Sequence, residues 1–136
     1  MTKPKVLFVD DEPDMLEGLA RLLRDEGIDV ETHTSVITLP LVVGAIDPDV
    51  ILLDLSMPAL SGLALLKMGR ARLRTDAPIV LFSGRSSEAL AKEAEEAGAD
   101  GFIAKSEESS DIVSRIQSWI DQRRALRAAT AAEANA

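Results

Sequence analysis

The residues that could do chemistry each stand directly after a short apolar run: the carboxylates Asp10, Asp11 and Asp54, the hydroxyl of Ser83 and the ammonium of Lys105. Carboxylates that converge repel one another unless a cation lies among them. A site of oxygen ligands that keeps several waters suits Mg²⁺. A carboxylate nucleophile beside Mg²⁺, a hydroxyl donor and a charge-neutralising ammonium can accept a phosphoryl group. The set predicts phosphoryl transfer to Asp54.

These residues meet only if the apolar runs are strands of one sheet. Five runs recur along the chain, at residues 6–9, 28–32, 50–53, 79–82 and 102–104. Helix-like segments lie between them, and parallel strands need right-handed crossovers. The pattern predicts an α/β fold with a doubly wound five-stranded parallel sheet and helices on both faces. Ligands of such a sheet collect at the carboxyl ends of the strands.

The first two helices differ in the strength of their sequence signal. Residues 14–26 form the clearest segment; its apolar residues, at i, i+4, i+7 and i+8, are Met15, Leu19, Leu22 and Leu23. The second segment, 35–45, contains Pro40, which costs roughly 3 kcal/mol in a helix interior. We expect this helix either to begin near Leu39, with Pro40 in its first turn, or to be kinked.

The later helices complete the alternation. The third is marked by Leu63, Leu66 and Leu73, the fourth covers residues 88–97 and ends at Gly98, and the last begins near Ser110. We expect one domain at 1–125 and an alanine-rich tail at 126–136, as a helix extension, frayed helix, disordered segment or linker remnant. On the last helix, the side chains of Trp119, Arg115, Arg123 and Arg124 either form a partner surface or are a half-buried ring and solvated arginines.

Composition excludes several classes of protein. Lys and Arg total 15 and Asp and Glu total 23, so the net charge is 15 − 23 = −8, and a nucleic-acid backbone would be repelled. There is no cysteine and only one histidine, His33, which excludes thiol catalysis and a multi-histidine metal site. The chain has no secretory apolar segment and no run near 18 apolar residues. We expect a cytoplasmic protein with no nucleic-acid or membrane partner.

Four segments together resemble a known family. These are "VLFVDDEPD", "PDVILLDLSMPALSGLALL", "APIVLFSGR" and "GADGFIAKS", in this order. They resemble the receiver domains of two-component response regulators, and the likeness spans residues 4 to 125. The resemblance implies a flavodoxin-like fold.

The resemblance also implies a ligand set for Mg²⁺. Asp54 is the phosphoacceptor and a metal ligand. Asp11 binds the metal directly, Asp10 does so through water or a proton-sharing contact, and Ser56 contributes its backbone carbonyl.

Other residues are assigned to the phosphoryl group by the same resemblance. Ser83 and Lys105 hold its oxygens, and Phe102 is an aromatic switch coupled to Ser83. Arg85, two residues after Ser83, flanks the access route, and we expect it to shield the acyl phosphate.

The sequence departs from the family pattern beside the site. Ser106 stands where most members have a proline, so a cis peptide is not expected there, because a non-proline cis bond costs roughly 2.5 to 4 kcal/mol. Gly84 replaces the alanine that usually follows the switch hydroxyl.

The resemblance implies a stand-alone receiver rather than an enzyme. It would take a phosphoryl group from a histidine kinase or a histidine phosphotransfer protein, assist its own phosphorylation and dephosphorylation, and act on an unknown downstream protein or in a phosphorelay. One alternative is a receiver-like scaffold that is not phosphorylated. Another is a phosphatase of the haloacid-dehalogenase type, in which the residue two after Asp10 would be aspartate; here it is Glu12.

Overall fold

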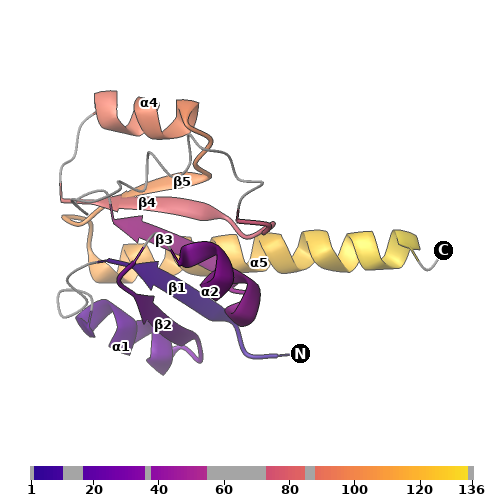
Figure 1. Ribbon diagram of the computed structural model, residues 1–136. Helices are drawn as coiled ribbons and strands as arrows, with labels where there is room; N and C mark the ends of the chain where they lie inside the picture. The colour runs from indigo at the N-terminus through magenta and orange to yellow at the C-terminus, as the bar shows by residue number, and fades with distance from the viewer. Residues whose placement is uncertain (1, 11–16, 36–37, 55–72, 85–87, 135–136) are drawn as a thin grey trace.

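The computed structural model describes residues 2–10, 17–35, 38–54, 73–84 and 88–134. Five strands lie where apolar runs predict them, within a residue at each end. They are β1 Lys5–Val9, β2 Asp29–His33, β3 Val50–Asp54, β4 Ile79–Ser83 and β5 Gly101–Ala104. The strands form one parallel sheet in the order β2-β1-β3-β4-β5. This confirms the predicted fold class. All the strands finish at the same end of the sheet, called the carboxyl edge below, and begin at the opposite end, called the amino edge (Figure 1).

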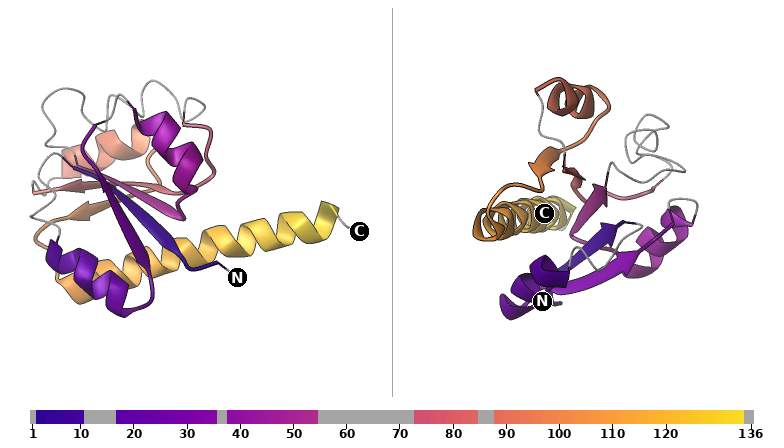
Figure 2. Two further views of the ribbon diagram at one scale, coloured as in Figure 1. Left: turned by 60° about the horizontal axis from the view of Figure 1, so that its bottom comes forward. Right: turned by 90° about the vertical axis from the view of Figure 1, so that its left-hand side faces the viewer.

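Helices cover both faces of the sheet (Figure 2). They are α1 Glu17–Asp25, α2 Leu39–Ile46, α4 Glu88–Glu96 and α5 Ser109–Ala134. One core packs α1 and α5 against side chains such as Phe8 and Ile103. The other core packs α2 and α4 against the opposite side chains, such as Leu7 and Leu81. Successive residues of the central strands β1, β3 and β4 therefore alternate between two buried layers, which is why these strands are almost entirely apolar. The edge strand β2 is more polar, and none of its residues is fully buried.

The structure corrects the predicted apolar stripe of α1 and decides between the two alternatives for α2. Leu19 and Leu23 of α1 are buried as predicted, but Leu22 is 41% exposed, so the buried stripe is narrower than the spacing suggested. Helix α2 begins at Leu39 with Pro40 in its first turn. The first turn leaves backbone N–H groups without intrahelical partners, so a proline there loses nothing, and the kinked alternative is wrong. The third predicted helix lies outside the described residues, apart from the buried Leu73.

The last helix is longer than the sheet is deep. Its 26 residues span about 39 Å at 1.5 Å per residue, whereas a five-residue strand spans about 17 Å. Because α5 begins at the carboxyl edge and runs back along the sheet, its second half projects past the amino edge, as the yellow end in Figure 1 shows. The helix continues beyond residue 125, where the sequence suggested a boundary, and residues 128–134 are exposed. No described helix is both long enough and apolar enough to cross a membrane.

Candidate phosphoryl-acceptor site

Two buried carboxylates lie side by side at the carboxyl edge of the sheet. Asp54 ends β3 and Asp10 follows β1 directly; the two strands pair with Val9 opposite Leu53. One residue further along, Asp10 therefore lies beside Asp54. Their exposed fractions are 3% and 2%. Burying two like charges together is unfavourable without compensating cations. The arrangement fits a cation site built from oxygen donors.

Lys105 supplies one of those positive charges. It follows β5, and its Nζ lies 3.1 Å from Oδ2 of Asp54, so its side chain reaches across β4 to β3. The ammonium also lies 5.4 Å from the centre of the Phe82 ring, which provides a further favourable contact for a cation. The structure thus brings together the lysine and the aspartate that the sequence predicted as partners.

Ser83 lies between them at the end of β4 and is 4% exposed. Its backbone carbonyl accepts a hydrogen bond of 2.7 Å from the amide of Lys105, which joins the two predicted phosphoryl-binding residues through the main chain. At the neighbouring Gly84, an added Cβ would meet only the Lys105 stem, at an ordinary 3.9 Å. The glycine is therefore not required there by a close contact.

Phe102 is half-buried and packs against the core beneath α2 and α4. Its backbone carbonyl accepts a 2.8 Å hydrogen bond from Nη2 of Arg115. The side chain therefore lies on the face of the sheet opposite α5, and its role as a switch stays a prediction.

Three predicted residues, Asp11, Ser56 and Arg85, lie outside the described residues. Within the part of the chain that the structure describes, no group of three or more His, Cys, Asp or Glu side chains could hold a metal. Asp10 and Asp54 are the described members of the expected Mg²⁺ site, and their oxygens are the donors that Mg²⁺ prefers.

A polar network near Lys105 was not found from the sequence. Glu107 accepts a 2.7 Å hydrogen bond from the Ala104 amide, and Arg115 donates to both Glu107 carboxylate oxygens, at 2.7 and 3.0 Å. The peptide bonds of the described residues are all trans, so the bond before Ser106 is trans as expected. The sequence did contain a signal for this network: an acid three residues after the end of a strand suits a tight turn, and an arginine nearly two turns into the next helix can reach it.

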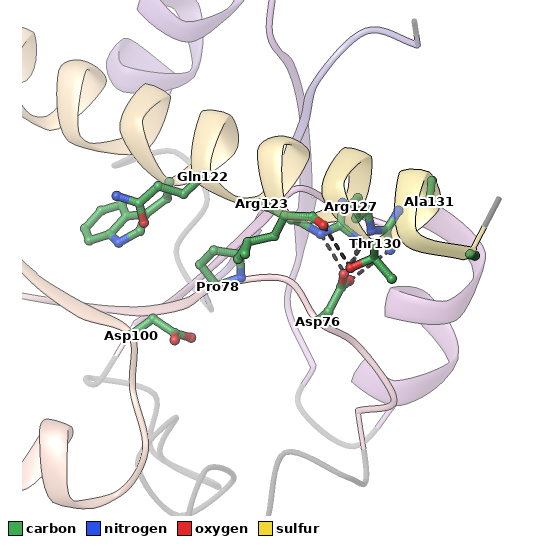
Figure 3. A pocket seen from close by; sticks show the side chains of 11 residues that line it. Asp76, Pro78, Asp100, Gln122, Arg123, Arg127, Thr130 and Ala131 are labelled. Atoms are coloured by element: carbon green, nitrogen blue, oxygen red, sulfur yellow. Dashed lines mark hydrogen bonds and ion pairs between the residues drawn. The ribbon is translucent and has the colours of Figure 1, made fainter. Parts of the chain in front are cut away.

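A second polar cluster lies at the opposite, amino edge of the sheet. Arg123 is 4% exposed and donates to Asp47, Asp49 and Asp76, with distances of 2.9 to 3.2 Å. Figure 3 shows its bonds to Asp76. The sequence offered two alternatives for Arg123, a partner surface or a solvated side chain. Both are wrong, because its guanidinium is buried in ion pairs. Arg127 binds the same Asp47 and Asp76 from the next turn of α5.

These ion pairs hold the cluster in its charged state. Hydrogen bonds from Arg127 and Arg123 lower the pKa of Asp47 and of Asp76, against an opposing effect of burial. At Asp49, burial acts to raise the pKa, but hydrogen bonds from Arg124, the Lys5 amide and Arg123 outweigh it, and the pKa is lowered. The cluster anchors the second half of α5 to the loops before β3 and β4.

Comparisons with known proteins identify the family of the chain. The family model for the response regulator receiver domain matches residues 6–117. The transcriptional regulatory protein PrrA of Mycobacterium tuberculosis is 34% identical over 123 residues, which are 90% of this chain and 52% of PrrA. The chain therefore spans about half the length of the curated relatives it matches.

Solved structures show the same fold. The BeF₃-activated N-terminal receiver domain of Klebsiella pneumoniae RstA matches with a TM-score of 0.77 and 26% identity, covering 85% of this chain and 97% of that one. The Vibrio cholerae chemotaxis protein CheY4 matches with a TM-score of 0.73 and 25% identity, covering 85% and 98%. These matches give no support to the phosphatase or scaffold alternatives. The chain belongs to the response regulator receiver domain family, whose members are phosphorylation-activated signalling switches rather than classical enzymes.

Proposed function

We propose that Asp54 accepts a phosphoryl group from the phosphohistidine of a histidine kinase or a histidine phosphotransfer protein. The observation that carries the proposal is the contact of 3.1 Å between Lys105 Nζ and Asp54 Oδ2, because it gives a buried carboxylate its own cation. An Asp54 oxygen attacks phosphorus, the phosphorus–nitrogen bond breaks, and its electron pair leaves with the imidazole. The product is an acyl phosphate.

Lys105 and Ser83 would then bind the phosphoryl oxygens. The ammonium can move from the carboxylate to the new anion without leaving its place above Phe82, and the Ser83 hydroxyl can donate to a second oxygen. Asp10, Asp11, Asp54 and the Ser56 carbonyl would hold Mg²⁺. When bound, the metal supplies positive charge for the phosphoryl oxygens.

The proposed output is binding to a downstream protein or passing the phosphoryl group along a relay. A net charge of −8 disfavours direct contact of this domain with a nucleic acid. Slow hydrolysis of the acyl phosphate, with the same residues around the phosphorus, would return the switch to its resting state.

Intact-mass measurement tests the proposal. Acetyl phosphate with Mg²⁺ should add about 80 Da, one phosphoryl group, to the wild-type protein. The addition should fail when EDTA replaces Mg²⁺ and in Asp54→Asn. Asp49 lies at the amino edge of the sheet, so Asp49→Asn serves as the control and should still gain one phosphoryl group. Equal labelling of Asp54→Asn and the wild type would exclude Asp54 as the acceptor.

A further inference from the structure

The free edge of β5 explains why Glu107 and Arg115 are placed as they are. Among the described strands, β5 lies at the side of the sheet and pairs with β4 alone. The Lys105 amide points to β4, where it donates to the Ser83 carbonyl. Backbone groups alternate along a strand, so those of Phe102 and Ala104 point away from β4 and need other partners.

Two side chains provide those partners. The Glu107 carboxylate accepts from the Ala104 amide at 2.7 Å, and the Arg115 guanidinium donates to the Phe102 carbonyl at 2.8 Å. Arg115 also makes a two-oxygen ion pair with Glu107 and stacks 5.3 Å from the centre of the Trp119 ring. The strand edge, the following turn and α5 are joined by one planar guanidinium.

The turn held in this way contains Lys105. It runs from Ala104 to Glu107 and is closed twice, by the Glu107 amide donating to the Ala104 carbonyl at 3.0 Å and by the Glu107 carboxylate accepting from the Ala104 amide. Lys105 and Ser106 are the two central residues, and Ser106 has no ring to restrict its backbone. The side chain of Glu107 therefore adds a constraint that Ser106 does not.

We propose that Glu107 and Arg115 are positioning residues for Lys105: they fix the turn so that the ammonium is held at the phosphoryl site. This inference rests on the proposed function, because Lys105 must contact the phosphoryl group for its placement to matter. Neither residue touches the reacting atoms. Their effect should appear in phosphoryl-group binding and not in Mg²⁺ binding, since Lys105 is not a metal ligand.

Titration with beryllofluoride, an acyl-phosphate mimic, tests this at saturating Mg²⁺. Calorimetry measures the Kd of Mg²⁺ alone and then of beryllofluoride. Glu107→Ala and Arg115→Ala should raise the Kd of beryllofluoride roughly tenfold, as expected for a misplaced binding group, and leave that of Mg²⁺ unchanged. Glu107→Gln, which retains an acceptor for the Ala104 amide, should have an intermediate effect. Glu108→Ala is the matched control, because Glu108 is the exposed next acid in the same loop, and it should match the wild type.

A double-mutant cycle separates positioning from a general structural role. In a Lys105→Ala background, Glu107→Ala should cause no further loss of beryllofluoride affinity, because the residue that it positions is gone. Equal losses with and without Lys105 would overturn the inference, as would wild-type affinity in both Glu107 variants. A wild-type protein that binds Mg²⁺ and not beryllofluoride would instead contradict the proposed function.

Discussion

At the scale of single residues, the site depends on the balance of charge around Asp54. Asp10 and Asp54 are buried side by side, and the Lys105 ammonium lies 3.1 Å from Asp54. Removing one partner of a buried ion pair leaves the other uncompensated, which costs more than the pair itself contributes. The excess of buried negative charge at Asp10 and Asp54 lowers the stability of the metal-free domain, and it favours the binding of a cation.

Lys105→Ala should therefore destabilise the metal-free domain. We expect a loss of roughly 1 to 3 kcal/mol in the free energy of unfolding, because the buried Asp54 carboxyl group then lies beside Asp10 without the ammonium. Adding Asp54→Asn to this variant should restore much of the loss. Urea unfolding in EDTA measures both variants, and a double variant less stable than Lys105→Ala would contradict the charge balance described here.

At the scale of elements, the contact between β5 and α5 links the site to the helix that crosses the domain. Trp119 packs on Gly101 so closely that an added Cβ would clash with the ring. Arg115 lies against the same ring and binds the Phe102 carbonyl. A movement of β5 would therefore be transmitted to Trp119, which is the single tryptophan of the chain.

Gly101→Ala should displace the Trp119 ring. We expect a loss of about 1 to 3 kcal/mol from overpacking and a shift of the tryptophan emission toward that of a solvated indole. Gly44→Ala is the matched control: Gly44 lies within α2 with open space around it, so alanine there should stabilise the domain by up to about 1 kcal/mol. Unchanged emission and stability in Gly101→Ala would show that the ring is not held against β5.

The strands and most helices could be predicted because each depends on local sequence. Buried strands read as apolar runs, and Gly98, with φ of +95°, ends the fourth helix as predicted. Long-range ion pairs do not have such a signal. Arg123 binds Asp47, Asp49 and Asp76, which are 47 to 76 residues away, so its burial depends on tertiary contacts that no spacing along α5 reveals. The role of Glu107 and Arg115 could not be predicted either, because it depends on β5 being an edge strand.

At the scale of the whole molecule, the two edges of the sheet carry different charge clusters. The carboxyl edge has aspartates with one described lysine, whereas the amino edge has Arg123, Arg124 and Arg127 paired with aspartates. Helix α5 connects the two edges. The amino-edge cluster stabilises the fold and orients the helix end, and the carboxyl edge carries the chemistry.

Arg123→Ala should destabilise the domain by about 1 to 3 kcal/mol, because the buried Asp49 would lose its closer cation and keep Arg124 at 3.2 Å. Arg127→Ala is the matched control. Its side chain is 47% exposed, so its pairs are screened by solvent and the loss should stay within about 1 kcal/mol. Comparable losses in the two variants would contradict the assignment of Arg123 as the buried centre of the cluster.

The same cluster makes stability depend on acid pH. The pKa values of Asp47, Asp49 and Asp76 are lower in the folded than in the unfolded chain, so their stabilisation is complete above the unfolded pKa of about 4. It is lost as the pH falls from there toward the folded pKa values. Urea midpoints between pH 6 and roughly pH 2.5 should decrease in the wild type, and less steeply in Arg123→Met. Parallel decreases in the two proteins would show that other carboxylates control acid unfolding.

The central claim is that Asp54 carries the phosphoryl group, and chemical trapping tests it most directly. Borohydride reduces an acyl phosphate on aspartate to the alcohol homoserine, and leaves an unmodified carboxylate or a phosphoserine unreduced. After treatment with acetyl phosphate, Mg²⁺ and then borohydride, peptide sequencing by mass spectrometry should find homoserine at position 54 and aspartate at position 10. Homoserine at position 10, or a phosphate retained on Ser83, would contradict the account.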